Sequence, residues 1–335
     1  MSSTVAISNR NSSRHARGSH EHTLSVTHMS GPRPTTFVET PALNAATGAD
    51  VLLAVEAFQP TGSFKLRAAD YVVRHIPHQS VIAVSSGNFG AAIAYACLAA
   101  GKRCTVVMPA NSVQVKVEAV RQFGATVDFV DTTRMTRAAR VAELAAANPD
   151  AYIASAYDDP LVIAGNASLG REIAAYDGRL DAVVVPVGGG GLASGIIQGL
   201  RGAGDGTPVI GAEPLMANDA AESLRQGRIV ASDDEKQTVA DGARTRSLGV
   251  HNWEILRTGL TTIVEVPEAT IRAAVRLLAE AAKLKVEPTG ALTVGALMTD
   301  PDRFRGKRVC CIVSGGNADP VLYQTILRNS DSGGT

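Results

Sequence analysis

This sequence has no formal net charge, few aromatic residues and no long apolar run. Its 335 residues include 32 basic and 32 acidic side chains, and aromatic residues make up 4%. A chain without a basic excess has no electrostatic footprint for nucleic acid or an anionic membrane, and few of its side chains can stack on bases. No apolar run reaches the roughly 18 residues that a membrane-spanning helix needs. We therefore expect neither nucleic acid nor a membrane as a partner.

Cysteine is scarce as well. The four cysteines are Cys97, Cys104, Cys310 and Cys311, and no two of them have the C-x-x-C spacing. The adjacent pair lies in a strand-like apolar run. This usage is typical of reduced thiols in or near the core of a cytosolic protein, so we expect a cytoplasmic location.

The sequence does contain enough apolar residues for a large core, with 45% hydrophobic residues. Its length predicts one large or two medium domains. The strand-like segments are 51–55, 81–84, 104–108, 126–130, 151–155, 181–187, 208–212, 262–266 and 308–313. The helix-like segments are 66–73, 90–100, 113–123, 133–147, 160–176, 192–201, 217–226, 267–284, 290–298 and 320–327. Apolar strands that alternate with helices predict an α/β fold of doubly wound, mainly parallel open sheets.

Residues 1–35 differ from the rest of the chain. They are rich in Ser, Arg, His and Thr, contain few acidic residues and show no hydrophobic periodicity. Such a composition predicts a disordered tail. The segment resembles a transit peptide only weakly, and it lacks the apolar stretch of a secretory signal.

One lysine, Lys65, stands in a polar turn between an apolar run and a helix start. Pro60 and Gly62 prevent a regular element before it, and the run 66–73 after it can begin a helix. A strand–turn–helix junction lies at the edge of a core, where a lysine loses part of its hydration. Desolvation lowers the pKa of the amine and makes it a nucleophile for Schiff-base chemistry, although most lysines in such turns are ordinary surface residues.

Four consecutive glycines, Gly188, Gly189, Gly190 and Gly191, connect a strand to a helix. Glycines let backbone N–H groups approach an anion, and the helix N-terminus attracts it, so the pattern predicts a phosphate site. The spacing Gly188-x-Gly190-x-x-Ala193 also fits a loose dinucleotide fingerprint, with Glu213 near the position of a ribose acceptor. A nicotinamide-dependent oxidoreductase is therefore an alternative.

Three further polar turns follow strands or begin helices. They are Ser85-Ser86-Gly87-Asn88-Phe89-Gly90, Glu287-Pro288-Thr289-Gly290 and Ser314-Gly315-Gly316-Asn317. The first turn suits a carboxylate, or it simply caps a helix. Loops at the carboxyl ends of parallel strands meet in one crevice, so we expect these turns and Lys65 to share a pocket.

Together, T-G-S-F-K-x-R, S-S-G-N, G-G-G-G and S-G-G-N resemble the pyridoxal-phosphate enzymes of fold type II, the tryptophan-synthase β-like group. The best match is the serine/threonine dehydratase and serine racemase branch, and the resemblance runs from about residue 36 to nearly the end of the chain. It implies a smaller domain, 81–157, inserted into a larger pyridoxal-phosphate-binding domain, 36–80 and 158–330. It also implies a homodimer.

The resemblance assigns roles to single residues. Lys65 would hold pyridoxal 5'-phosphate through a Schiff base and move the Cα proton, with Phe64 near the ring. Asn88 would bond the ring hydroxyl, the four glycines the phosphate, and Ser314 the pyridine nitrogen. Ser85, Ser86, Asn88 and the backbone at Phe89 would form the substrate loop. In racemases of this branch, the serine that matches Ser86 is the acid/base opposite the lysine.

The stretch from Glu213 to Asp219 resembles the divalent-cation site of this branch. The ligands would be the two carboxylates and the Ala217 carbonyl, oxygen donors that suit Mg²⁺ or Ca²⁺. Alternatively, Glu213 and Asp219 cap the helix that starts near Ala217. Glu287 would contribute to this region or to the active site.

The implied activity is that of an ammonia-lyase, or dehydratase. It would convert a small β-hydroxy amino acid of the serine, threonine or 3-hydroxyaspartate type to a 2-oxo acid and ammonia. An amino-acid racemase using Lys65 and Ser86, or a β-replacement enzyme, is the alternative. Where the branch commonly reads S-S-G-N-H-G-Q, this chain has Phe89 and Ala91, so its substrate preference is open. We expect no regulatory domain after the helix at 320–327.

Overall fold

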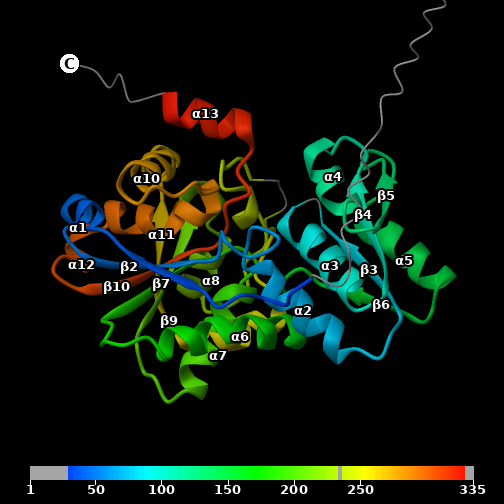
Figure 1. Ribbon diagram of the computed structural model, residues 1–335, viewed down its shortest axis with the longest axis horizontal. Helices are drawn as coiled ribbons and strands as arrows, with labels where there is room; N and C mark the ends of the chain where they lie inside the picture. The colour runs from blue at the N-terminus through cyan, green and yellow to red at the C-terminus, as the bar shows by residue number, and fades with distance from the viewer. Residues whose placement is uncertain (1–28, 86, 113, 233–235, 329–335) are drawn as a thin grey trace, which may run out of the picture.

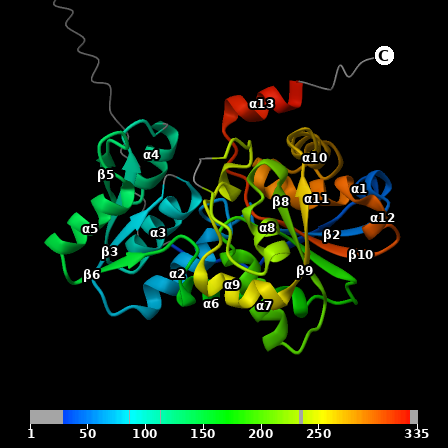
Figure 2. The same cartoon turned by 180° about the vertical axis from the view of Figure 1, so that it is seen from behind.

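The computed structural model describes residues 29–85, 87–112, 114–232 and 236–328. Its strands form one six-stranded and one four-stranded sheet. Figure 1 shows the two sheets side by side, each with its own helices, and Figure 2 shows the same arrangement from behind. The prediction of two mainly parallel sheets in an α/β fold is therefore confirmed.

The six-stranded sheet has the order β1-β2-β10-β7-β8-β9. These strands are β1 (Thr36–Glu39), β2 (Asp50–Val55), β7 (Ala182–Pro186), β8 (Val209–Pro214), β9 (Leu260–Val266) and β10 (Arg308–Val313). All neighbouring strands run parallel except β1, which pairs with β2 in the antiparallel sense. The last strand of the chain thus lies in the middle of the sheet, beside the strand that precedes Lys65.

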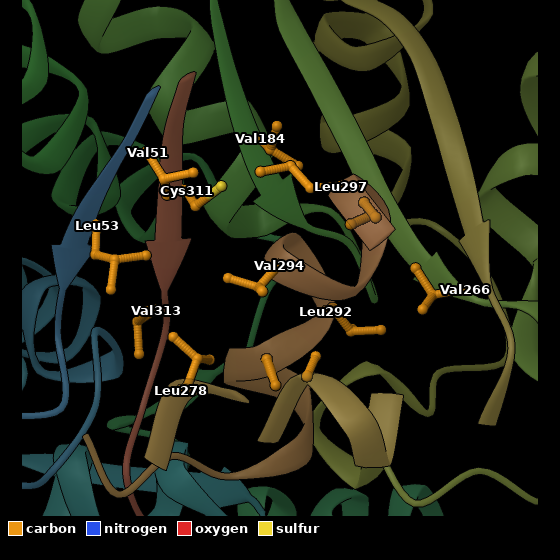
Figure 3. Packing of buried hydrophobic residues seen from close by; sticks show 14 of the residues in the cluster. Val51, Leu53, Val184, Val266, Leu278, Leu292, Val294, Leu297, Cys311 and Val313 are labelled. Atoms are coloured by element: carbon orange, nitrogen blue, oxygen red, sulfur yellow. The ribbon is translucent and has the colours of Figure 1, made fainter. Parts of the chain in front are cut away.

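Both faces of this sheet are apolar, which explains why its strands show no polar alternation. In β2, Val51 and Leu53 enter one core cluster, and Leu52 and Ala54 enter the cluster on the opposite face. The first face is covered by α1 (Pro41–Thr47), α10 (Glu268–Ala281), α11 (Pro288–Thr299), α12 (Pro301–Phe304) and α13 (Pro320–Arg328). Figure 3 shows this packing, with Leu292, Val294 and Leu297 of α11 against the strands. The opposite face is covered by α6 (Pro160–Ala174), α7 (Gly191–Gly202) and α9 (Val250–Gly259).

The four-stranded sheet is entirely parallel, with the order β5-β4-β3-β6. Its strands are β3 (Ser80–Val84), β4 (Arg103–Pro109), β5 (Thr126–Val130) and β6 (Ala151–Ala154). Its helices are α3 (Asn88–Ala99), α4 (Gln114–Arg121) and α5 (Arg137–Ala147), and α2 (Lys65–His75) shares a core cluster with α3. The domain limits 81–157, 36–80 and 158–330 stay a prediction.

Some expected boundaries were wrong for local reasons. The helix expected at 133–147 begins only at Arg137, because the Thr136 side chain accepts a hydrogen bond from the Ala139 N–H and caps it there. The helix expected at 267–284 ends at Ala281, and Lys283 has a left-handed backbone (φ 56°). Strand β1 and helices α1, α9 and α12 were not expected.

All four cysteines are free and buried, as predicted. No helix among the described residues has the length and apolar character to cross a membrane. Of the tail predicted at 1–35, residues 1–28 lie outside the described residues.

Candidate active site

The loop that carries Lys65 is held against the end of β10. The Phe64 N–H donates to the Ser314 carbonyl at 3.0 Å, and the Gly316 N–H donates to the Gly62 carbonyl at 2.9 Å. Gly62 has a φ of 72°, a left-handed conformation that glycine adopts without strain. Lys65 then becomes the first residue of α2. The turn therefore fixes Lys65 at the carboxyl edge of the large sheet.

The Lys65 side chain is partly buried, and its amine contacts protein groups. Its Nζ donates to the Ala156 carbonyl at 2.7 Å and lies 5.0 Å from the ring centre of Phe64 and 5.8 Å from that of Phe89. Burial lowers the pKa of Lys65 to about 8, although the negative charge of Glu287 raises it. The neutral, nucleophilic form of the amine therefore reaches about half near pH 8, where an ordinary lysine is almost entirely protonated.

The glycine loop lies between β7 and α7 and is closely covered. A Cβ at Gly189 would lie 2.3 Å from the Tyr157 ring, and a Cβ at Gly188 would lie 3.0 Å from the Ala243 Cα. The Asn252 amide donates to the Gly189 carbonyl at 2.8 Å and holds the loop. These residues form a narrow cradle at the N-terminus of α7, where backbone N–H groups attract an anion.

Ser314 directly follows β10, the neighbour of the strand β7 that leads into the glycine loop. Its side chain is buried, and its Oγ has no hydrogen-bond partner among the described residues. A buried hydroxyl without a partner costs free energy, so such an atom indicates a missing ligand group. Ser314 thus offers a hydrogen bond to a polar atom bound beside Lys65.

Asn88 is held by two long-range contacts. Its Nδ2 donates to Glu287 Oε1 at 2.8 Å, and its Oδ1 accepts from Asn317 Nδ2 at 2.9 Å. Glu287 is the N-cap residue of α11, and burial raises its pKa to about 7. The two contacts fix the amide so that its second N–H remains available for a ligand.

The predicted substrate loop is partly described. Ser85 follows β3, and its Oγ accepts a hydrogen bond from the Gly87 N–H at 3.2 Å. Phe89 is buried, with its ring beside the Lys65 amine. Ser86 lies outside the described residues.

The predicted cation ligands lie at the end of β8. The Glu213 carboxylate accepts from the N–H groups of Ala220 and Ala221 at 3.0 and 2.9 Å, so it caps α8 (Asp219–Gln226) as the alternative reading had it. Both carboxylate oxygens of Asp219 are buried and have no partner within the described ranges. Ala217 lies in the 3₁₀ helix η2 (Leu215–Ala217) and is fully buried. Burial raises the pKa of Asp219 to about 6.

Sequence reasoning missed Ala156, Tyr157 and Asn252, each of which contacts Lys65 or the glycine loop. The first two follow β6 directly, so their place at a strand's carboxyl end was a usable signal. Asn252 lies in α9, a helix that the periodicity did not reveal. In the described part of the chain, no group of three His, Cys, Asp or Glu side chains could hold a metal.

The chain is similar to known proteins over most of its length. The family described as "Pyridoxal-phosphate dependent enzyme" matches residues 29–315. The chain is 37% identical to the L-threo-3-hydroxyaspartate ammonia-lyase of Pseudomonas sp, covering 85% of this chain and 90% of that protein. It is 31% identical to the serine racemase of Homo sapiens, covering 86% of this chain and 87% of that protein. The crystal structure of the T.th. threonine deaminase matches with a TM-score of 0.81 at 36% identity, covering 86% of this chain and 94% of that one.

Proposed function

This chain belongs to the family of pyridoxal-phosphate dependent enzymes, and we propose that it is an ammonia-lyase for β-hydroxy amino acids. The observation that carries the proposal is the Lys65 amine, which donates to the carbonyl of Ala156, the neighbour of the Tyr157 that covers the glycine loop. The unpartnered hydroxyl of Ser314, whose backbone carbonyl accepts from the Phe64 N–H, supports it. A family member with this lysine context, T-G-S-F-K-x-R, resembles the dehydratases rather than the cysteine synthases.

The residues present fit pyridoxal phosphate. Lys65 would bond to the cofactor's aldehyde carbon, Gly188 to Gly191 would hold its phosphate, and Ser314 would hydrogen-bond its ring nitrogen. The free N–H of Asn88 would bond the ring hydroxyl, and Phe64 would pack beside the ring. The alternative of a nicotinamide cofactor explains neither the buried amine nor the orphaned hydroxyl.

The bound cofactor supplies an electron sink for negative charge at the substrate's Cα. Lys65 then serves as the base that takes the Cα proton, since burial lowers the pKa of its amine to about 8, close to the pH at which it would work. A serine hydroxyl at the ring nitrogen carries no charge, so the cofactor would be an electron sink of moderate strength. A moderate sink favours prompt loss of the substrate's β-hydroxyl group. Phe64 and Phe89 exclude water from the Lys65 amine. The released enamine takes up water and yields a 2-oxo acid and ammonia.

The substrate is a small β-hydroxy amino acid of the serine, threonine or 3-hydroxyaspartate type. The similarity to the L-threo-3-hydroxyaspartate ammonia-lyase supports the last of these. Ser85, Ser86 and the backbone at Phe89 would bind the α-carboxylate at the N-terminus of α3. A homodimer in the cytoplasm is part of the proposal, on the strength of the family resemblance and the free cysteines.

A divalent cation, Mg²⁺ or Ca²⁺, would bind beside the site through Asp219, the Ala217 carbonyl and Glu213. The two orphaned oxygens of Asp219 support this assignment, since such oxygens suit a hard cation. Its role would be structural, because these residues span the connection from the end of β8 to the start of α8.

Replacement of Lys65 tests the proposal. Lys65→Ala is expected to remove the yellow Schiff-base absorbance and the release of ammonia, while far-UV circular dichroism stays unchanged. Lys283→Ala is a suitable control, because Lys283 is an exposed lysine at the end of α10. A Lys65→Ala variant that keeps both the colour and the turnover contradicts the assignment.

Racemisation is the second candidate, since the chain is 31% identical to a serine racemase over most of its length. Chiral analysis after incubation with L-serine separates the two activities. In a racemase, Ser86→Ala is expected to abolish formation of D-serine before it affects release of ammonia. A chain that forms no D-serine is a lyase only.

A further inference from the structure

An ion pair joins a helix of the four-stranded sheet to the segment that covers the glycine loop. Lys116 Nζ lies 2.8 Å from Asp241 Oδ2. Lys116 belongs to α4, which packs on the four-stranded sheet, whereas Asp241 begins the 3₁₀ helix η3 (Asp241–Ala243). Sequence reasoning assigned neither residue to the site. About two-fifths of each side chain is exposed, so both ends of the pair can be reached from solvent.

This pair lies next to the cofactor-binding residues. A Cβ at Gly188 would lie 3.2 Å from the Gly242 carbonyl, so η3 covers the glycine cradle. The Gly242 N–H donates to Thr289 Oγ1 at 3.0 Å, and Thr289 follows two residues after Glu287, the partner of Asn88. Electrostatics agree with this placement: Asp241 raises the pKa of Glu287, and Lys116 and Lys65 both lower it.

Two of the described side chains at the site, those of Phe89 and Lys65, offer a second carboxylate no free cation. Phe89 presents an apolar ring, and Lys65 is committed to the reaction. A charged group that enters a partly desolvated pocket without a counter-charge is strongly disfavoured. A substrate that carries a second carboxylate therefore needs a cation at the mouth of the site, and Lys116 supplies one.

We propose that Lys116 binds the distal carboxylate of a dicarboxylic β-hydroxy amino acid, and that Asp241 pairs with the Lys116 ammonium until this substrate binds. The inference rests on the proposed function and narrows it to dicarboxylic substrates. Exchange of one carboxylate for another is easy here, because a half-exposed ion pair is weak and the Lys116 charge stays neutralised throughout. Serine and threonine have no group to make this exchange.

Two measurements test the assignment, with Arg303→Met as the matched control. Arg303 forms an ion pair of similar length and exposure with Asp300, near the opposite end of the large sheet. In Lys116→Met, kcat/KM for 3-hydroxyaspartate is expected to fall by about tenfold to a hundredfold, while the value for serine falls less than about threefold. In Asp241→Asn, kcat/KM for the dicarboxylate is expected to rise relative to serine.

The second measurement is direct binding of succinate, an unreactive dicarboxylate, by calorimetry to the holoenzyme. Binding is expected to weaken by a similar factor in Lys116→Met and to stay unchanged in Arg303→Met. Equal losses for 3-hydroxyaspartate and serine, or unaltered succinate binding in Lys116→Met, overturn the inference. A wild-type protein that binds succinate through Lys116 but releases no ammonia contradicts the proposed function and leaves the carboxylate site supported.

Discussion

Lys65 derives its reactivity from its surroundings. Its amine is buried, donates to the Ala156 carbonyl and lies beside two aromatic rings, while the carboxylate of Glu287 partly offsets the effect of burial. Burial disfavours the charged ammonium, so the pKa falls from the ordinary 10.5 to about 8. The same side chain can therefore attack an aldehyde as a free amine and later take up a proton.

This shift predicts how the protein takes up its cofactor. Only the neutral amine attacks pyridoxal phosphate, so loading of the apoprotein is expected to speed up between about pH 7 and 9, with a midpoint near pH 8. Stopped-flow absorbance of the yellow Schiff base gives the rate.

Glu287→Gln is the control for this pH dependence of cofactor loading. Removal of the negative charge takes away the interaction that raises the Lys65 pKa, so the midpoint is expected to move below pH 8. A midpoint near the 10.5 of an exposed lysine in the unaltered protein would show that the amine is hydrated.

Site residues that stand in contiguous motifs could be predicted from the sequence. Site residues that come together only in the folded protein could not. Lys65, the four glycines and Ser314 stand in turns whose local chemistry is readable. The contact of Asn88 with Glu287 joins residues 199 positions apart, and no local pattern encodes it. No local pattern singles out Lys116, because its partner Asp241 belongs to η3 and meets α4 only in the folded protein.

At the scale of elements, α6 and α7 position the glycine loop by packing unusually closely. A Cβ at Gly199 would lie 2.3 Å from the Ala167 carbonyl, and a Cβ at Gly195 would lie 2.4 Å from the Asn166 Cβ. The Asn166 amide in turn donates to the Gly191 carbonyl at 3.0 Å, at the start of α7. The small residues of α7 thus bring the two helices together and hold the phosphate cradle in place.

Gly199→Ala tests this packing. The added methyl group meets backbone atoms that cannot move away, so the free energy of unfolding in urea is expected to fall by about 1–3 kcal/mol. Gly202→Ala is the control in the same helix, since a Cβ there meets nothing within 4 Å. This variant is expected to be as stable as the original or more stable by up to about 1 kcal/mol. Equal effects of the two substitutions would rule out close packing as the reason for Gly199.

Strand and helix order was largely predictable, because apolar runs and capping residues are local signals. The missed elements have physical reasons. β1 is a four-residue edge strand with partly exposed residues, and α1 spans only seven residues. Helix α9 has few buried residues, and those pack on α7, so its own periodicity is weak.

At the scale of the whole molecule, a largely buried charge network near the active-site lysine anchors α2 to α6 and to the segment after β2. Arg67 of α2 donates to Glu56 at 2.7 Å and to Glu172 of α6 at 2.6 Å. It also donates to the Arg33 carbonyl at 3.2 Å, so the segment before β1 joins the network. Because Arg67 lies two residues after Lys65, this network holds the helix that presents the amine.

The two sheets bring their carboxyl ends to this region from opposite sides. Lys65, Gly188 and Ser314 follow strands of the large sheet, while Ser85 and Ala156 follow strands of the small one. A crevice at the carboxyl ends of parallel strands is the usual ligand site of such folds. Both sheets are therefore needed to assemble the cofactor residues, the substrate loop and Lys116 in one place.

The activity proposed for this protein is the removal of ammonia from β-hydroxy amino acids. The most direct test measures ammonia and 2-oxo acid together, from a panel of L- and D-β-hydroxy amino acids, with pyridoxal phosphate and Mg²⁺ present. Equal amounts of the two products are expected from at least one member, with 3-hydroxyaspartate favoured over serine. A yellow protein that forms neither product from any member would contradict this proposal and would point to racemisation or β-replacement instead.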